Sequence, residues 1–150
     1  MLTDLKTAAE AVGITTIIAQ SDKNINDQLN RIIREETLPV ALISWDLNVN
    51  LEFNENGQLG NPTTDVTMLI VDKANTLEKI DLEKKAEEVG ELFIDFIRGY
   101  KDHLVANTNV KQDPITNISF VYAPSYGNGK HSGVLAKFTT ELNLVPKCTV

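Results

Sequence analysis

The chain has 150 residues, a length that fits one domain, and it carries a net charge of −7. The acidic balance argues against a protein whose main task is to grip nucleic acid, because that affinity comes largely from Lys and Arg on phosphates. Cys148 is the only cysteine, so an intrachain disulfide is excluded. We expect neither a secretory signal at the N-terminus nor a membrane span, since no window approaches ~20 apolar residues.

The N-terminal third of the chain predicts two helices around a short strand. Apolar residues at helical spacing predict a helix over Leu2–Val12, with Thr3 as its N-cap and Gly13 as its stop. The β-branched segment Ile14–Ala19 predicts a short strand. A second helical pattern covers Asn24–Glu35.

Two adjacent segments then carry the clearest strand signals. The apolar run LPVALISW at Leu38–Trp45 is typical of a strand that is covered on both faces or lies at a subunit contact. Trp45–Phe53 alternates between apolar and polar residues, which predicts a half-buried strand. The polar face of this strand consists of Asp46, Asn48, Asn50 and Glu52. These oxygen-bearing side chains could hold a hard cation, or they form a polar outer face or a face that meets another subunit.

A turn-rich segment, Asn54–Thr63, separates this pattern from a returning strand at Thr64–Val71. Asn56-Gly57 favours a tight primed turn, but a tight hairpin there would place Gly60 and Pro62 inside the returning strand. We therefore predict a longer, exposed loop.

The longest helical pattern in the chain is Asp81–Leu104, with Asp81 as its expected N-cap. Its apolar stripe consists of Leu82, Ala86, Val89, Phe93, Ile97, Tyr100 and Leu104. Two further strands are predicted at Asn117–Ala123 and Gly133–Leu142, joined by a loop. Together these elements predict an α+β fold, in which a mostly antiparallel β-sheet packs against one long helix with short N-terminal helices. We expect a single domain over residues 1–150 with a loose C-terminal tail from about residue 144.

Few residues suggest catalytic chemistry. The glycines around Lys130 do not match a phosphate loop, because His131 stands where Ser or Thr is required and a strand follows. His103 and His131 have no spacing that joins them in a metal site, and His103 is interpreted as a charge near a helix C-terminus. No nucleophile elbow, dinucleotide fingerprint or redox cysteine pair is present, so we predict neither a cofactor nor a metal. The helix also carries an acidic line, interpreted as a solvated face or a surface for a basic neighbour, formed by Glu83, Glu87, Glu91 and Asp95.

The element order and several segments resemble the tail terminator proteins of long-tailed bacteriophages and related head–tail neck proteins. The segments concerned are LPVALISW at Leu38–Trp45, TDVTMLIVDK at Thr64–Lys73 with the helix that follows, FVYA at Phe120–Ala123 and KFTTELN at Lys137–Asn143. The resemblance implies a non-enzymatic virion protein that forms a hexameric ring at the head-proximal end of the tail tube, stops tube growth and joins tail to head. It implies as partners further copies of the chain, the tail tube protein and a head completion or stopper protein, with DNA passing unbound. It also implies a location in the virion neck or tail, after synthesis in the bacterial host cytoplasm.

Exposed loops and the acidic helix face are the candidate contact surfaces. The residues are Asn54, Glu55, Asn56, Gln58, Glu83, Glu87, Glu91, Tyr126 and Lys130. Two alternatives stay open: a small soluble binding or enzyme module with a loop-built site at 54–63 and 125–132, and a bacterial adaptor that dimerises through its sheet edge.

Overall fold

A computed structural model describes residues 2–19, 39–74, 76, 78–107, 113–126 and 131–142, without the side chains of 17–19, 45–47 and 124–126. In chain order the elements are α1 (Leu2–Ala11), β1 (Thr15–Ala19), β2 (Val40–Asn50), β3 (Thr63–Lys73), α3 (Lys79–Asn107), β4 (Ile115–Tyr126) and β5 (His131–Glu141). The predicted helix at Asn24–Glu35 and the predicted tail from residue 144 lie outside the described residues. No helix in the described part of the chain is long and apolar enough to cross a membrane.

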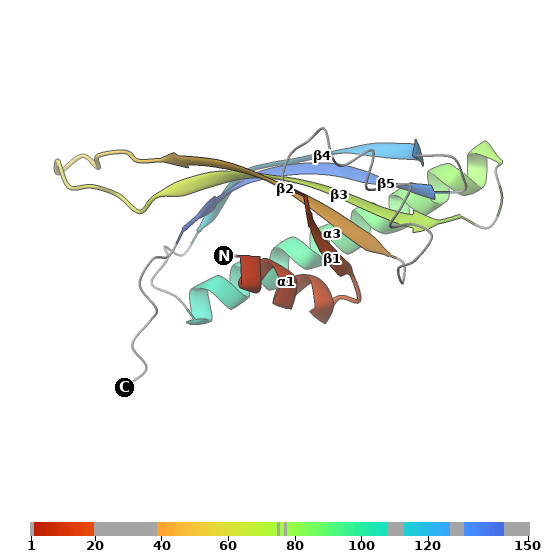
Figure 1. Ribbon diagram of the computed structural model, residues 1–150, viewed down its shortest axis with the longest axis horizontal. Helices are drawn as coiled ribbons and strands as arrows, with labels where there is room; N and C mark the ends of the chain where they lie inside the picture. Colours follow the sequence, from red (N-terminus) through yellow and green to blue (C-terminus); the bar gives the residue numbers. More distant parts are fainter. Residues whose placement is uncertain are drawn as a thin grey trace.

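The five strands form one sheet in the order β1-β2-β3-β5-β4. Strand β1 runs parallel to β2, and the other three neighbouring pairs are antiparallel. Both helices lie on the same face of the sheet (Figure 1). Helix α3 crosses β3, β4 and β5, whereas α1 packs against α3 and β1. The predicted α+β class, a mostly antiparallel sheet against one long helix, is confirmed.

The main core lies between α3 and the helix-facing side of the sheet. The predicted stripe of α3 is confirmed, with Ile97 partly buried at its margin, and the structure adds Phe96 as a fully buried member. Phe96 stacks on Tyr100 with ring centroids 5.9 Å apart, and Phe93 meets Phe138 of β5 at 6.5 Å. These aromatic contacts attach the long helix to the middle of the sheet.

Apolar side chains are also buried on the outer face of the sheet, opposite the helices. Val40 pairs with Val71 and Leu42 with Leu69, and all four are fully buried although they alternate with the residues of the main core. The apolar run LPVALISW was predicted to form a strand that is covered on both faces or lies at a subunit contact; of its described residues, Val40–Ser44 are buried on both faces of the sheet.

The ends of the two helices differ from the sequence predictions at their N-termini. Thr3 lies inside α1, where its carbonyl accepts a hydrogen bond from Thr7 Oγ1, so it is not the N-cap. Asp81 lies in the first turn of α3 and accepts a hydrogen bond from Thr76 Oγ1, and Thr76 also accepts one from the backbone N–H of Glu78. Glu78 precedes the helix, and its carbonyl accepts hydrogen bonds from the N–H groups of Asp81 and Leu82, both at 3.1 Å. The helix therefore begins earlier than the sequence pattern indicated.

Gly13 ends the first helix as predicted. Its φ is +83°, its N–H donates to Glu10 O at 3.0 Å, and the N–H of Ile14 donates to Ala9 O at 2.9 Å. This pair of bonds is the Schellman arrangement, which needs a residue in the left-handed region and so favours glycine. The turn directs the chain from α1 into β1.

Candidate functional site

The segment between β2 and β3 is a hairpin that projects from one end of the sheet. We call residues 49–62 the arm; Figure 1 shows it extending past both helices. At its tip, Gly57 N–H donates to Asn54 O at 2.9 Å and Asn54 N–H donates to Gln58 O at 2.7 Å. With Gly57 at φ +73°, this is a three-residue hairpin loop with a glycine bulge, which is shorter than the loop that we predicted, although the segment is exposed as expected.

The side chain of Asn54 stabilises this tip. Its Oδ1 accepts hydrogen bonds from the backbone N–H groups of Asn56 at 3.0 Å and Gln58 at 2.9 Å. An asparagine side chain that replaces a backbone acceptor in this way is a common turn device. The candidate contact residues Asn54, Glu55, Asn56 and Gln58 thus lie together, all exposed, on a tip whose backbone is held by hydrogen bonds.

The arm keeps strand-like pairing below its tip. Phe53 bridges to Leu59, and Gly60 N–H donates to Glu52 O at 2.8 Å. A Cβ at position 60 would lie 3.1 Å from that same oxygen, so the close approach of the two segments favours glycine. At the base, Leu142 N–H donates to Pro62 O at 2.7 Å. We predicted against a tight hairpin because it would place Gly60 and Pro62 inside the returning strand. That objection was wrong, because both residues lie before β3, which begins at Thr63.

The apolar face of the arm is exposed, which corrects the prediction of a half-buried strand at Trp45–Phe53. The side chains of Val49, Leu51, Phe53 and Leu59 are between 52% and 75% exposed, with Phe53 the most exposed. Val49 pairs with Thr64, on the helix-facing side of the sheet, but the arm extends beyond the helices (Figure 1). No second layer covers it among the described residues. The predicted separate strand is also absent, since β2 continues through a bulge between Trp45 and Val49.

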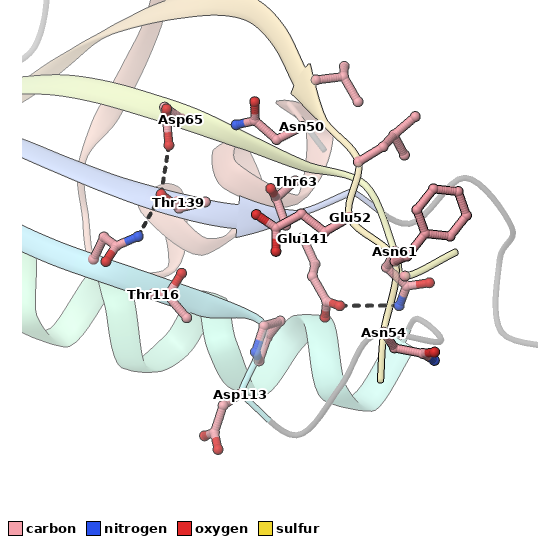
Figure 2. A pocket seen from close by; sticks show the side chains of 16 residues that line it. Asn50, Glu52, Asn54, Asn61, Thr63, Asp65, Asp113, Thr116, Thr139 and Glu141 are labelled. Atoms are coloured by element: carbon pink, nitrogen blue, oxygen red, sulfur yellow. Dashed lines mark hydrogen bonds between the residues drawn. The ribbon is translucent and has the colours of Figure 1, made fainter. Parts of the chain in front are cut away.

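A groove of about 720 Å³ lies between the arm and the ends of β4 and β5, and it is lined by many polar residues together with Val49, Leu51 and Phe53 of the arm (Figure 2). Cross-strand pairing explains its lining: Asn50 pairs with Thr63 and Thr63 with Glu141, while Thr139 pairs with both Asp65 and Thr116. Its carboxyl groups are those of Glu52, Asp65, Asp113 and Glu141, and no Lys, Arg or His is among its lining residues.

Several of the groove carboxylates are engaged in protein contacts. Asp65 accepts a hydrogen bond from Thr139 Oγ1 at 2.6 Å, and Glu141, which is 5% exposed, accepts one from Asn61 at 3.2 Å. Asp113 pairs with Lys101 at 3.1 Å. Among the described residues, no group of three or more His, Cys, Asp or Glu is placed to hold a metal ion. Asn50 and Glu52 line the groove, and both belong to the polar strand face that we considered as a candidate cation site.

The remaining candidate contact residues lie away from the arm. Glu83, Glu87 and Glu91 are exposed on the N-terminal half of α3, and Glu83 pairs only loosely with Lys79 at 3.7 Å. Tyr126 ends β4 opposite His131, at the sheet end where Ser132 Oγ donates to Leu82 O of α3. Lys130 lies outside the described residues.

The two loops of the alternative binding module are also separated. Strands β3 and β5 pair from Thr63–Glu141 at one end to Lys73–His131 at the other. Segment 54–63 adjoins the Thr63–Glu141 end, and the described parts of 125–132 adjoin the Lys73–His131 end. A ladder of this length separates them by on the order of 30 Å. The structure therefore does not bring these two loops into one site.

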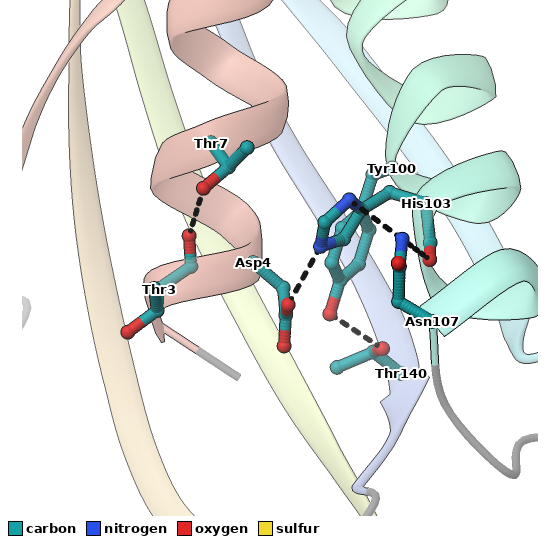
Figure 3. Close-up of polar contacts among 7 residues, drawn as sticks. All are labelled: Thr3, Asp4, Thr7, Tyr100, His103, Asn107 and Thr140. Atoms are coloured by element: carbon teal, nitrogen blue, oxygen red, sulfur yellow. Dashed lines mark hydrogen bonds and ion pairs between the residues drawn. The ribbon is translucent and has the colours of Figure 1, made fainter. Parts of the chain in front are cut away.

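Polar contacts near the C-terminus of α3 join this helix to α1 and β5 (Figure 3). His103 Nε2 lies 2.7 Å from Asp4 Oδ1, which joins α3 to α1, and Asn107 Nδ2 donates to His103 O at 2.9 Å. Tyr100 OH lies 3.0 Å from Thr140 Oγ1 of β5, and burial raises the pKa of this phenol. A raised phenol pKa keeps Tyr100 neutral, as a hydrogen-bonded core residue should be.

His131, at the start of β5, is expected to make folding sensitive to pH. Its burial, and secondarily the charge of Lys73, lower the pKa of His131, and its Nδ1 has no hydrogen-bond partner among the described residues. As pH falls below the ordinary histidine pKa of about 6.5, the unfolded chain gains a proton that the folded chain resists. We expect urea unfolding midpoints to fall between pH 8 and pH 5.5, and to fall less in His131→Gln. An equal fall in both proteins would contradict this role of His131.

No protein-family model matches the chain, and no curated protein shows significant sequence similarity to it.

Proposed function

We propose that the protein is a non-enzymatic structural subunit that assembles with copies of itself into a closed ring. The observation that carries the proposal is the exposed apolar face of the arm, formed by Val49, Leu51, Phe53 and Leu59. Contiguous exposed apolar surface on a soluble protein is typical of an interaction site. Full burial of one such side chain contributes about 1.5–3 kcal/mol, so four together can hold a subunit contact.

The sequence resemblance suggests what such a ring does. As a tail terminator, it would sit at the head-proximal end of a phage tail tube, stop tube growth and join the tail to the head. Its further partners are then the tail tube protein and a head completion or stopper protein. The net charge of −7 supports this role, because an acidic ring repels the phosphates of DNA that passes through it. The acidic residues Glu83, Glu87 and Glu91 are exposed and free to face a lumen or a basic neighbour.

The alternative of a small binding or enzyme module receives less support. Segment 54–63 and the described parts of 125–132 lie at opposite ends of the β3–β5 ladder. The groove beside the arm has carboxylates that are held by Thr139, Asn61 and Lys101. These contacts describe a hydrogen-bonded surface rather than a set of groups poised for catalysis.

The test is the oligomeric state of an arm variant. We expect the wild-type protein to form a discrete ring in size-exclusion chromatography with light scattering and in negative-stain images, with six copies as the resemblance predicts. Phe53→Asp should weaken each subunit contact by about 10- to 100-fold, the value of one buried aromatic side chain, and leave a folded monomer.

Ile80→Asp is the matched control, because it also replaces an exposed apolar side chain with aspartate, but on α3 and away from the arm. We expect this control to assemble like the wild type. A wild-type protein that stays monomeric at every concentration, or a Phe53→Asp protein that still forms rings, would contradict the proposal.

A further inference from the structure

Strand β4 has an unprotected edge. It is the last strand of the described sheet, so one of its edges is unpaired there. Edge strands in soluble proteins usually carry charges that prevent pairing with another chain, but the sequence of β4 contains no charged residue. Apart from the arm and Ile80, the exposed large apolar side chains of the described residues all belong to β4 or to α3; these are Ile94, Val105, Ile118, Val121 and Tyr122. The edge is therefore a candidate for pairing with a further strand.

The exposed side chains of β4 lie on both faces of the sheet. Tyr122 faces the helices, because its ring lies 3.1 Å from the position of a Cβ added to Gly90 of α3. Val121 alternates to the opposite face, beside its half-buried cross-strand partner Leu135 of β5. A partner that rests on one face would leave the other uncovered. A strand paired along the edge covers both, because its own side chains alternate between the same two faces.

The regular part of this edge is Ser119–Ala123. The pairing of β4 with β5 shifts between Thr116 and Ser119 and shifts again between Ala123 and Tyr126. Between these two irregularities the residues of β4 pair in register with β5. This length is ordinary for a short strand, so a second strand can pair with it, but the contact is small.

One side of α3 borders this edge, and its charges change sign along the helix. Gly90 lies beneath Tyr122, and residues on the same side of the helix follow at steps of three and four. We call these residues the α3 flank; they are Glu83, Glu87, Gly90, Ile94, Arg98 and Lys101. The ion pair of Lys101 with Asp113, at 3.1 Å and just before β4, supports this placement. The flank is thus acidic towards the start of α3, apolar at Ile94 and basic towards the end.

Two α3 flanks are complementary when they run antiparallel. Two β4 edges that pair antiparallel about a two-fold axis keep both α3 helices on the same face of the joined sheet. Helix α3 packs on β5 and β4, and neighbouring strands lie about 4.8 Å apart, so helices beneath the two β5 strands lie about 14 Å apart, within reach of long charged side chains. Glu83 and Glu87 of each copy then lie towards Arg98 and Lys101 of the other, with Ile94 near the axis. This charge complementarity favours a second copy as the occupant of the edge.

We propose that two copies of the protein pair through their β4 edges, antiparallel, to form one continuous sheet. Val121 of one copy then lies opposite Val121 of the other, and Tyr122 lies opposite Phe120, so exposed apolar and aromatic side chains become cross-strand neighbours. The contact is isologous, because both copies use the same surface. It goes beyond the proposed ring, since it does not use the arm. Because the regular edge is short, the contact is weak and forms only as the protein concentration rises.

An exchange of charges between two flanks tests the antiparallel arrangement. All variants carry Phe53→Asp, which weakens the arm contact and leaves a monomer when dilute. We expect this background to dimerise in sedimentation equilibrium as its concentration is raised. Adding either Glu87→Lys or Arg98→Glu should raise the dimer dissociation constant roughly three- to tenfold at low salt, because like charges then meet twice. An equimolar mixture of the two variants should recover the dissociation constant of the background, because their flanks carry opposite charges.

Val121→Lys tests the edge itself. It places two like charges opposite each other at the centre of the joined strands, and a lysine is a common protection of an edge strand. We expect it to abolish dimerisation of the Phe53→Asp background over the same concentrations. Leu51→Lys is the matched control, because Leu51 is 56% and Val121 61% exposed, and Leu51 lies on the arm. The control should leave the dimer dissociation constant unchanged, and both variants should keep the circular dichroism spectrum of the background.

The outcomes separate this inference from the proposed ring. If the wild type forms rings but Phe53→Asp stays monomeric at every concentration, the β4 contact is overturned and the ring stands. If the mixture of flank variants dimerises no more strongly than either variant alone, the antiparallel pairing is overturned. If the wild type forms only dimers, and Val121→Lys prevents them, the β4 contact stands and the ring fails.

Discussion

Phe93→Asp is expected to leave the protein unfolded or close to unfolding at neutral pH. Phe93 is 1% exposed, and its ring lies 5.6 Å from that of Phe120 and 6.2 Å from that of Phe96. Removal of a buried phenylalanine ring alone costs about 3–5 kcal/mol, and the buried carboxylate adds to this. The total stability of a domain is only about 5–15 kcal/mol. Near-ultraviolet circular dichroism and urea titration would measure the loss.

Ile80→Asp is the matched control for this change, since it introduces the same side chain into the same helix. Ile80 is 71% exposed in the first turn of α3, where a negative charge is favoured by the helix dipole. We expect its unfolding midpoint to equal that of the wild type or to exceed it slightly. A stable, cooperatively unfolding Phe93→Asp protein would show that this face of α3 does not pack on the sheet.

Gly133→Ala is the second change with a large expected effect. Gly133 pairs with Val71 in the middle of the sheet, and an added Cβ would lie 1.7 Å from Ile70 O and 2.9 Å from Val71 Cα. These are backbone atoms of β3, so no side chain can rotate away to make room. Overpacking usually costs 1–3 kcal/mol, and we expect at least ~3 kcal/mol here, because the two strands must separate. The midpoint of urea unfolding would report it.

Gly99→Ala provides the contrast, because the same methyl group meets no atom within 4 Å on the exposed surface of α3. An alanine in a helix is favoured over glycine by about 0.5–1 kcal/mol, so this variant should be more stable than the wild type. Similar destabilisation in both variants would contradict the attribution of the effect at Gly133 to the close approach of β3 and β5.

The fold class could be predicted because its signals are local and periodic. The apolar spacing of α3, the β-branched β1 and the strand patterns of β3 and β5 each require only neighbouring residues to be recognised. Helix starts were predicted less well, since the hydrogen bonds of Thr76 depend on the conformation of the chain before α3. Phe96 was missed because the predicted apolar stripe included one residue for each step of three or four along the helix. The buried face of α3 is wider, and Phe96 packs there against Phe138 of β5.

The candidate site depended on contacts distant in sequence. Alternation at Trp45–Phe53 predicts two faces, but it cannot say whether a second layer reaches the apolar one. The helices do not extend as far as the arm, so a pattern typical of a half-buried strand forms an exposed hairpin. Within it, Val49 and Phe53 are 52% and 75% exposed. Sequence alone did mark Asn54–Thr63 as exposed. It did not show that β4 is an edge, because strand order is set by long-range pairing.

The sequence by itself thus determined the α+β class, the long helix with its buried stripe, the acidic charge and the exposure of the segment after Phe53. These properties follow from residue type and short-range spacing. Only the tertiary structure decided that β5 lies between β3 and β4, that the acidic helix face and the arm lie apart, and that the apolar side chains of the arm are exposed among the described residues. The physical reason is that a side chain becomes buried only when a second element packs against it. The local sequence pattern specifies the first element but not the partner that covers it.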